Sequence, residues 1–157
     1  MSKKVLGIKV VGGSVHWVLL EGTFDKPTYL DHRKEVIPSG KRPDETANWA
    51  ETVFTNILSS TKPEAIVYRL TIPYMGKGLS TAQVFNMYFP LGVLNLVASR
   101  AGIDIKSLSP QATSAPAYGL AKGANPTDHV LQVLGKHPPY WNGEMLDAAG
   151  VALLGLK

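Results

Sequence analysis

Three charged residues each interrupt an apolar stretch of this sequence. Lys9 stands within VLGIKVV, Arg69 interrupts AIVYRL, and Asp147 is the single charge deep in the apolar segment near the C-terminus. A charge removed from water is costly unless an opposite charge or a hydrogen-bonding group compensates it. These residue types can form buried ion pairs, and the two cations can also bind an anion such as a phosphate.

The first element that positions one of them is a β-hairpin. Residues 4–21 contain two apolar runs on either side of Gly12-Gly13, a strong signal for a tight turn between antiparallel strands. The first run is apolar on both faces, as in a strand buried in mid-sheet, and Lys9 shares a face with Val5. The lysine is therefore predicted to be internal and to need a partner.

The rest of the chain alternates strand and helix patterns. Further strands are expected over 29–37, 65–70 and 103–108, and helices over 44–60, 80–100, 110–120, 127–136 and 144–156. Asp44, and Thr127 or Asp128, are expected to cap helices, and Pro90 is expected to kink or divide the long apolar helix. This order predicts an α/β fold, a five-stranded mixed sheet with helices on both faces.

Length and composition predict one domain over 1–157. The 157 residues are 45% hydrophobic, enough for one core. Zero cysteines exclude disulfides, thiolate metal ligands and thiol nucleophiles. The N-terminus has no signal-peptide pattern and no apolar run is long enough to span a bilayer, so a soluble, cytoplasmic protein without a membrane partner is expected. A net charge of +4 suits a phosphate-bearing partner.

Three local patterns resemble the RuvC-like branch of the RNase H-like superfamily, the Holliday-junction resolvases. Leu-Gly-Ile-Lys at 6–9, followed by Gly-Gly-Ser at 12–14, is similar to that family's first strand and turn, an apolar residue, Gly-Ile-Asp and then Gly-Ser. Residues 63–69 resemble its fourth strand, which ends in a catalytic Glu. Residues 146–153 resemble its closing helix, Asp-Ala-Ala-Asp-Ala-Leu-Ala. The likeness runs across nearly the whole chain and implies an RNase H-like fold.

The resemblance implies a metal-dependent nuclease centre, and this sequence departs from it there. In the family, four carboxylates gather around two divalent metals that activate water and stabilise the leaving oxygen of a phosphodiester. The first, second and fourth of these positions are here Lys9, Arg69 and Gly150, and only Asp147 remains. Cations in place of carboxylates should repel Mg²⁺ or Mn²⁺, so neither a metal site nor a cofactor is expected.

The matching positions predict a salt-bridged triad in which Asp147 lies between Lys9 and Arg69. One interpretation is a buried ion cluster that only fixes the packing of two strands and a helix. In the other, Lys9 or Arg69 reaches a nucleic-acid phosphate. Glu144, one helical turn before Asp147, could complete half of a relocated metal site, or could simply suit the positive end of the helix dipole.

Other basic and aromatic residues are candidate nucleic-acid contacts. Lys77 lies between two glycines in a region that approaches DNA in resolvases, although an ordinary solvated loop explains it equally well. Lys122 and Lys136, with Tyr140 and Trp141, could form a basic and aromatic rim that stacks on unpaired bases. The two aromatic residues could equally form a packing plug or a surface for a protein partner.

The sequence thus predicts a catalytically inactive RuvC-like domain that binds branched or single-stranded nucleic acid, or a protein that processes it. A first alternative is a metal-dependent nuclease that uses Asp147 and Glu144 with Mg²⁺ or Mn²⁺. A second is a protein-interaction module or inhibitor that keeps the fold only as a scaffold. Because family resolvases act as dimers, the resemblance also allows a homodimer.

Overall fold

The structure is a computed structural model that describes residues 2–70 and 80–157, so Lys77 lies outside the described residues. The strands are β1 (Lys3–Val11), β2 (Ser14–Gly22), β3 (Pro27–Val36), β4 (Ala65–Arg69) and β5 (Asp104–Leu108). The helices are α1 (Pro43–Thr61), α2 (Thr81–Ala101), α3 (Pro126–Leu134) and α4 (Gly143–Gly155). Two 3₁₀ turns, η1 (Gln111–Thr113) and η2 (Ala115–Tyr118), follow β5.

The strands form one mixed sheet of five strands in the order β3-β2-β1-β4-β5. The pairs β1–β2 and β2–β3 are antiparallel, whereas β4 runs parallel to both β1 and β5. The predicted α/β class and five-stranded mixed sheet are therefore confirmed. β1 lies at the centre of the sheet, as its apolar residues on both faces predicted.

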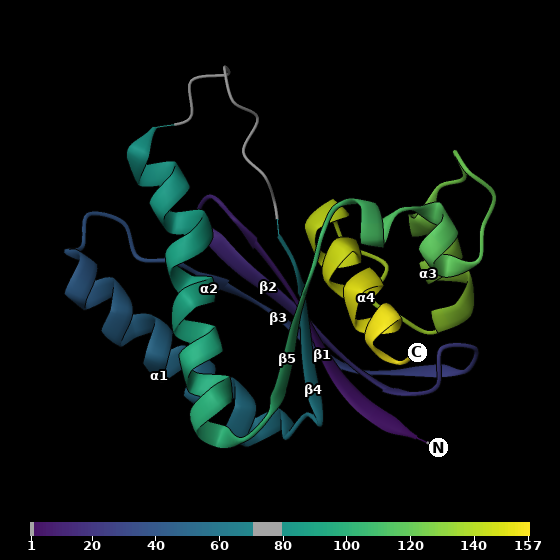
Figure 1. The fold of residues 1–157 in the computed structure, drawn as a ribbon, viewed down its shortest axis with the longest axis horizontal. Helices are drawn as coiled ribbons and strands as arrows, with labels where there is room; N and C mark the ends of the chain where they lie inside the picture. Colours follow the sequence, from purple (N-terminus) through teal and green to yellow (C-terminus); the bar gives the residue numbers. More distant parts are fainter. Residues whose placement is uncertain (1, 71–79) are drawn as a thin grey trace.

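Helices cover both faces of the sheet (Figure 1). Leu6 and Ile8 of β1 pack into the core beneath α1 and α2. Val5, between them and the N-terminus, packs on the opposite face with residues of α3 and α4. Because successive side chains of a strand point to opposite faces, Lys9 lies on the α4 face together with Val5.

Glycines let α4 lie directly on the central strands. A Cβ added at Gly7 would overlap the carbonyl oxygen of Ala148 and lie 2.6 Å from the Cβ of Ala152. A Cβ added at Gly155 would lie 2.7 Å from a methyl carbon of Val5. The absence of side chains at these two points allows the close approach that places the start of α4 beside the end of β1.

Several predicted boundaries are wrong at the helix ends. Helix α1 begins at Pro43 and its N-cap is Arg42 rather than Asp44. Proline at the first helical position needs no hydrogen-bond acceptor, so the helix can start one residue earlier. Helix α3 is capped by Asn125, whose side chain accepts a hydrogen bond from the Thr127 amide, and it ends at Leu134.

Two further expectations about helices are corrected. Residues 110–120 form the two short 3₁₀ turns instead of one helix. Of the two effects expected of Pro90, division of the helix is wrong, because α2 is one element from Thr81 to Ala101 with Pro90 inside it. None of the helices in the described ranges combines the length and hydropathy needed to cross a membrane.

Candidate functional site

β1 and α4 bring Lys9 and Asp147 together. The Nζ atom of Lys9 lies 3.5 Å from Oδ2 of Asp147. The lysine side chain is 9% exposed and the aspartate side chain 39% exposed, so the ammonium is enclosed while the carboxylate is open on one side. The structure thus supplies Lys9 with the opposite charge that its burial requires.

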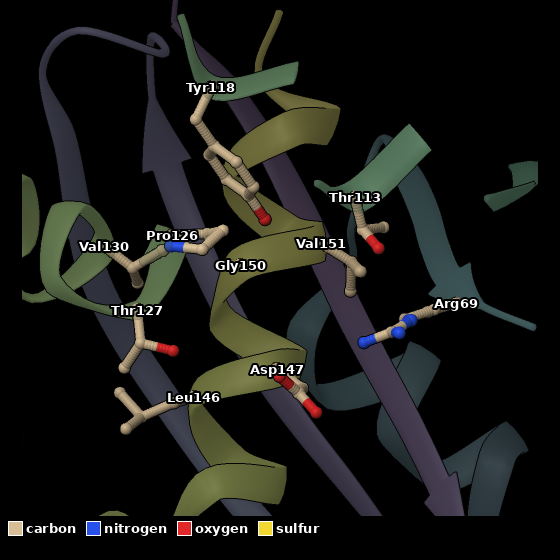
Figure 2. A pocket seen from close by; sticks show the side chains of 10 residues that line it. All are labelled: Arg69, Thr113, Tyr118, Pro126, Thr127, Val130, Leu146, Asp147, Gly150 and Val151. Atoms are coloured by element: carbon tan, nitrogen blue, oxygen red, sulfur yellow. The ribbon is translucent and has the colours of Figure 1, made fainter. Parts of the chain in front are cut away.

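Arg69 ends β4 on the same face of the sheet. The last residues of β1 and β4 that are paired are Ile8 and Tyr68, so Lys9 and Arg69 follow side by side on neighbouring strands. Figure 2 shows the Arg69 guanidinium group extending from β4 toward the space next to Asp147. Its Nε atom is buried and has no hydrogen-bond partner among the described residues.

The predicted triad is wrong in one respect. Within the described residues Asp147 forms an ion pair with Lys9 and not with Arg69. Arg69 and Asp147 instead line a common cavity, from β4 and α4 respectively. The site is therefore an ion pair with a second cation beside it.

This cavity, which we call the Arg69 cavity, has a volume of about 150 Å³. Its other polar lining residues are Thr113, Tyr118 and Thr127. Because the charge of Lys9 compensates that of Asp147, the positive charge of Arg69 remains for a further anion.

Tyr118 fills the position where the resemblance expects a fourth carboxylate. A Cβ added at Gly150 would lie 2.7 Å from the Tyr118 hydroxyl oxygen. Burial raises the pKa of Tyr118 and the nearby charge of Asp147 raises it further, whereas Arg69 lowers it. The cavity wall over Gly150 is thus a neutral phenol that can donate a hydrogen bond.

The described residues contain no group of three or more His, Cys, Asp or Glu side chains that could hold a metal ion. Glu144 lies in the first turn of α4, where its charge acts on His16 of β2. Glu144 and Asp147 therefore have no third His, Cys, Asp or Glu side chain beside them, among the described residues, to complete an acidic metal site.

The predicted basic contacts do not join this cavity. Lys122 precedes α3 and Lys136 follows it, so the two lie beyond opposite ends of that helix. Both are exposed, and neither lines the Arg69 cavity. Their contribution to nucleic-acid binding stays a prediction, as does that of Lys77.

Sequence reasoning missed a cluster of aromatic rings next to this site. Trp141, just before α4, packs edge-on against Tyr29 and His32 of β3, with ring centroids 5.3 Å apart in both pairs. The Tyr140 hydroxyl lies 3.2 Å from Nε2 of His32. The Tyr-Trp pair was a visible signal, but nothing in the sequence indicated that β3 would be its partner.

Comparison of the sequence with protein-family models and with curated proteins gives no match. Solved structures do match. RuvC of T. thermophilus in complex with a Holliday junction substrate has a TM-score of 0.76 and 18% identity, over 98% of this chain and 91% of that one. The yeast mitochondrial Holliday junction resolvase has a TM-score of 0.66 and 14% identity, over 97% of this chain and 77% of that one.

A third similar structure is that of a viral resolvase. The fowlpox virus resolvase, in complex with Holliday junction DNA, has a TM-score of 0.56 and 9% identity, over 98% of this chain and 96% of that one. At such low identity these similarities establish the architecture and not the chemistry. The predicted fold is confirmed: this chain has the RNase H-like fold of the RuvC-type Holliday junction resolvases.

Proposed function

We propose that this protein binds branched or single-stranded nucleic acid at a RuvC-like site without cleaving it. The observation that carries the proposal is Arg69, a cation that lines a cavity with a buried Nε atom and has no ionic partner among the described residues. A guanidinium group binds phosphate oxygens through charge-assisted hydrogen bonds. The hydroxyl of Tyr118 offers a further donor in the same cavity.

The solved structures support nucleic acid as the partner class. Two of the similar proteins, the T. thermophilus and fowlpox virus resolvases, were solved with Holliday junctions bound. The net charge of +4 favours any phosphate-bearing ligand. A phosphate at Arg69 would lie on the same face of the sheet as the Lys9–Asp147 pair.

The absence of cleavage follows in this proposal from the charges around Asp147. Metal-dependent phosphodiester cleavage needs acidic ligands that hold one or two divalent ions. Here the carboxylate of Asp147 is already paired with the ammonium of Lys9. A dication at Asp147 would have to displace a buried cation and approach a second one, Arg69, across the cavity.

Fluorescence anisotropy with a four-way junction, a duplex and a single strand tests this. We expect binding that weakens with salt, is equal in EDTA and in Mg²⁺ or Mn²⁺, and yields no cleaved product. Arg69→Gln should weaken binding about tenfold and lower the salt slope by about one. Arg100→Gln, an exposed arginine paired to Glu51 across α1 and α2, is the matched control and should leave affinity unchanged.

The opposing outcomes separate the alternatives. Cleavage of the junction in Mg²⁺ or Mn²⁺ would contradict the proposal and favour the metal-dependent nuclease. Equal affinity of the wild type and Arg69→Gln would show that the Arg69 cavity does not bind the phosphate. If the wild type binds none of the three nucleic acids, the proposal is contradicted and the protein-interaction module is favoured.

A further inference from the structure

A second hollow lies beside the Lys9–Asp147 pair, and we call it the aromatic pocket. Its volume is about 390 Å³, within the range of small-molecule sites. Residues that line it include His16, His32, Lys34, Tyr140 and Trp141. It is formed by β2, β3 and the segment that leads into α4.

A β-bulge in β3 builds one wall of the aromatic pocket. Leu19 pairs with Asp31 and Leu20 pairs with Tyr29, so Leu30 is an extra residue in the ladder. The bulge places Tyr29 and His32, three residues apart, on the same face, where their rings touch with centroids 5.7 Å apart. The tyrosine hydroxyl is hydrogen bonded to Nδ1 of His32, which fixes the orientation of the imidazole.

Tyr140 is both fixed and exposed. Its hydroxyl is held at Nε2 of His32 and the two ring centroids lie 5.8 Å apart, yet 73% of the residue is accessible to solvent. A packing plug would bury this ring, and this ring is not buried. An aromatic face that is oriented by a hydrogen bond but open to solvent is a platform on which a flat ligand can stack.

Two buried polar atoms in the same pocket have no partner among the described residues. They are Nδ1 of His16 and Nε1 of Trp141. His16 is 2% exposed, and its other ring nitrogen lies 2.9 Å from the Ser14 hydroxyl. Because a buried polar atom without a hydrogen bond costs free energy, both atoms favour a ligand whose edge carries donors and acceptors.

We infer that the aromatic pocket binds an unpaired nucleobase stacked on Tyr140. A base has a flat π face for the tyrosine and a polar edge for His16 and Trp141. Lys34, exposed on β3, supplies a positive charge for the phosphate attached to that nucleotide. A nucleotide in a single strand combines this π face, this polar edge and the neighbouring anionic phosphate.

The aromatic pocket is placed so that one single-stranded nucleic acid could contact both this pocket and the Arg69 cavity. His16 is the partner of Lys9 in the β1–β2 register, and Met145 of the pocket precedes Asp147 by two residues. The two hollows thus flank the Lys9–Asp147 ion pair. The inference rests on the proposed function, and it assigns an unpaired base of the bound nucleic acid to the aromatic pocket.

A single strand that carries 2-aminopurine tests the inference, because the fluorescence of this base is quenched on stacking. We expect quenching by the wild type, and Tyr140→Ala should abolish it and weaken single-strand binding roughly 5- to 100-fold. Tyr140→Phe keeps the ring and should bind like the wild type. Duplex binding should be the same for all three proteins, since a paired base cannot enter the pocket.

The results distinguish this inference from the proposed function. Loss of single-strand affinity with Tyr140→Ala but no effect of Arg69→Gln would support the pocket and overturn the Arg69 cavity. Equal single-strand affinity of Tyr140→Ala and the wild type would overturn the pocket while leaving the cavity in place. An equal loss of duplex and single-strand affinity would also overturn it, because stacking on a free base would then not be the cause.

Discussion

Lys9 and Asp147 share one ion pair but stand in unequal surroundings. The lysine side chain is 9% exposed and the aspartate side chain 39% exposed. If the carboxylate is removed, the ammonium stays enclosed without a counter-charge. If the ammonium is removed, water can solvate the open side of the carboxylate.

This asymmetry predicts that Asp147→Asn destabilises the protein more than Lys9→Met does. We expect losses in the free energy of unfolding of about 2–3 kcal/mol for the first and about 1 kcal/mol or less for the second. Urea denaturation with unchanged m-values measures both. Equal losses, or the reverse order, would contradict the burial that the structure gives to Lys9.

His16 predicts a pH dependence of stability. Burial lowers the pKa of His16 in the folded protein, and Lys34 and Lys9 lower it further against the opposing charge of Glu144. Below the ordinary histidine pKa of about 6.5, the unfolded chain takes up a proton here that the folded protein does not. This contribution to stability is therefore complete above that pH and is lost as the pH falls toward the folded-state pKa.

The free energy of unfolding should thus decrease between pH 7.5 and 5.5 by up to about 1.4 kcal/mol per pH unit for this one group. His32, whose pKa burial also lowers, adds to the decrease. In His16→Gln, which can keep the hydrogen bond to Ser14, the decrease should be smaller. A variant that loses as much stability as the wild type over this range would show that His16 is not the group responsible.

At the level of elements, the contact between β1 and α4 positions the whole site. Gly7 lies two residues before Lys9 on the same face, and its missing side chain lets α4 rest on the strand. The atoms that a Cβ at Gly7 would meet belong to the backbone of α4 and to Ala152, so they cannot rotate away. The same contact that packs the helix therefore brings Asp147 to Lys9.

Gly7→Ala should consequently destabilise the protein by about 3 kcal/mol or more and loosen the ion pair. Gly92→Ala is the matched control, because Gly92 is exposed within α2 and a Cβ there would meet nothing within 4 Å. It should raise stability by roughly 0.5–1 kcal/mol through its better helix propensity. Thermal denaturation measures the stability of both variants. Similar melting temperatures for Gly7→Ala and Gly92→Ala would contradict the close packing of α4 on β1.

The elements also show what the sequence could and could not predict. The spacing of apolar residues predicted the five strands and the α/β class, because each strand has its own local pattern of apolar residues. It did not show the bulge at Leu30, because a single unpaired residue leaves alternation almost intact. The aromatic pocket depends on that bulge. The contact between His32 and Tyr140 therefore could not be predicted from the sequence.

The whole molecule combines the RuvC-type architecture with an ion pair and a second cation on the α4 face of its sheet. The fold depends on many apolar positions, each replaceable by another apolar residue, so it persists at 18% identity to T. thermophilus RuvC. The site depends on a few charged positions, and the resemblance identified them. It could not show that Arg69 would stand apart from Asp147, because that distance depends on side-chain conformation.

If these positions share the geometry of a metal centre, reversing two charges should create one. Lys9→Asp combined with Arg69→Glu would add two carboxylates to that of Asp147, so that three lie on the α4 face of the sheet. Without metal their repulsion should lower the melting temperature below that of the wild type. Mg²⁺ or Mn²⁺ should restore it, by about 2.7 kcal/mol of stability at 100 times the Kd, whereas the wild type should show no shift.

The control for this variant is Lys122→Asp with Lys136→Glu, which changes the net charge equally at exposed positions away from the site. Differential scanning fluorimetry in EDTA and in each metal compares the three proteins. A metal-dependent rise confined to the Lys9/Arg69 variant would mean that the two cations occupy the positions where acids would hold metal ions. A folded variant without such a rise would show that the three side chains do not converge closely enough to hold a metal ion, and that the two cations do not stand at metal-ligand positions.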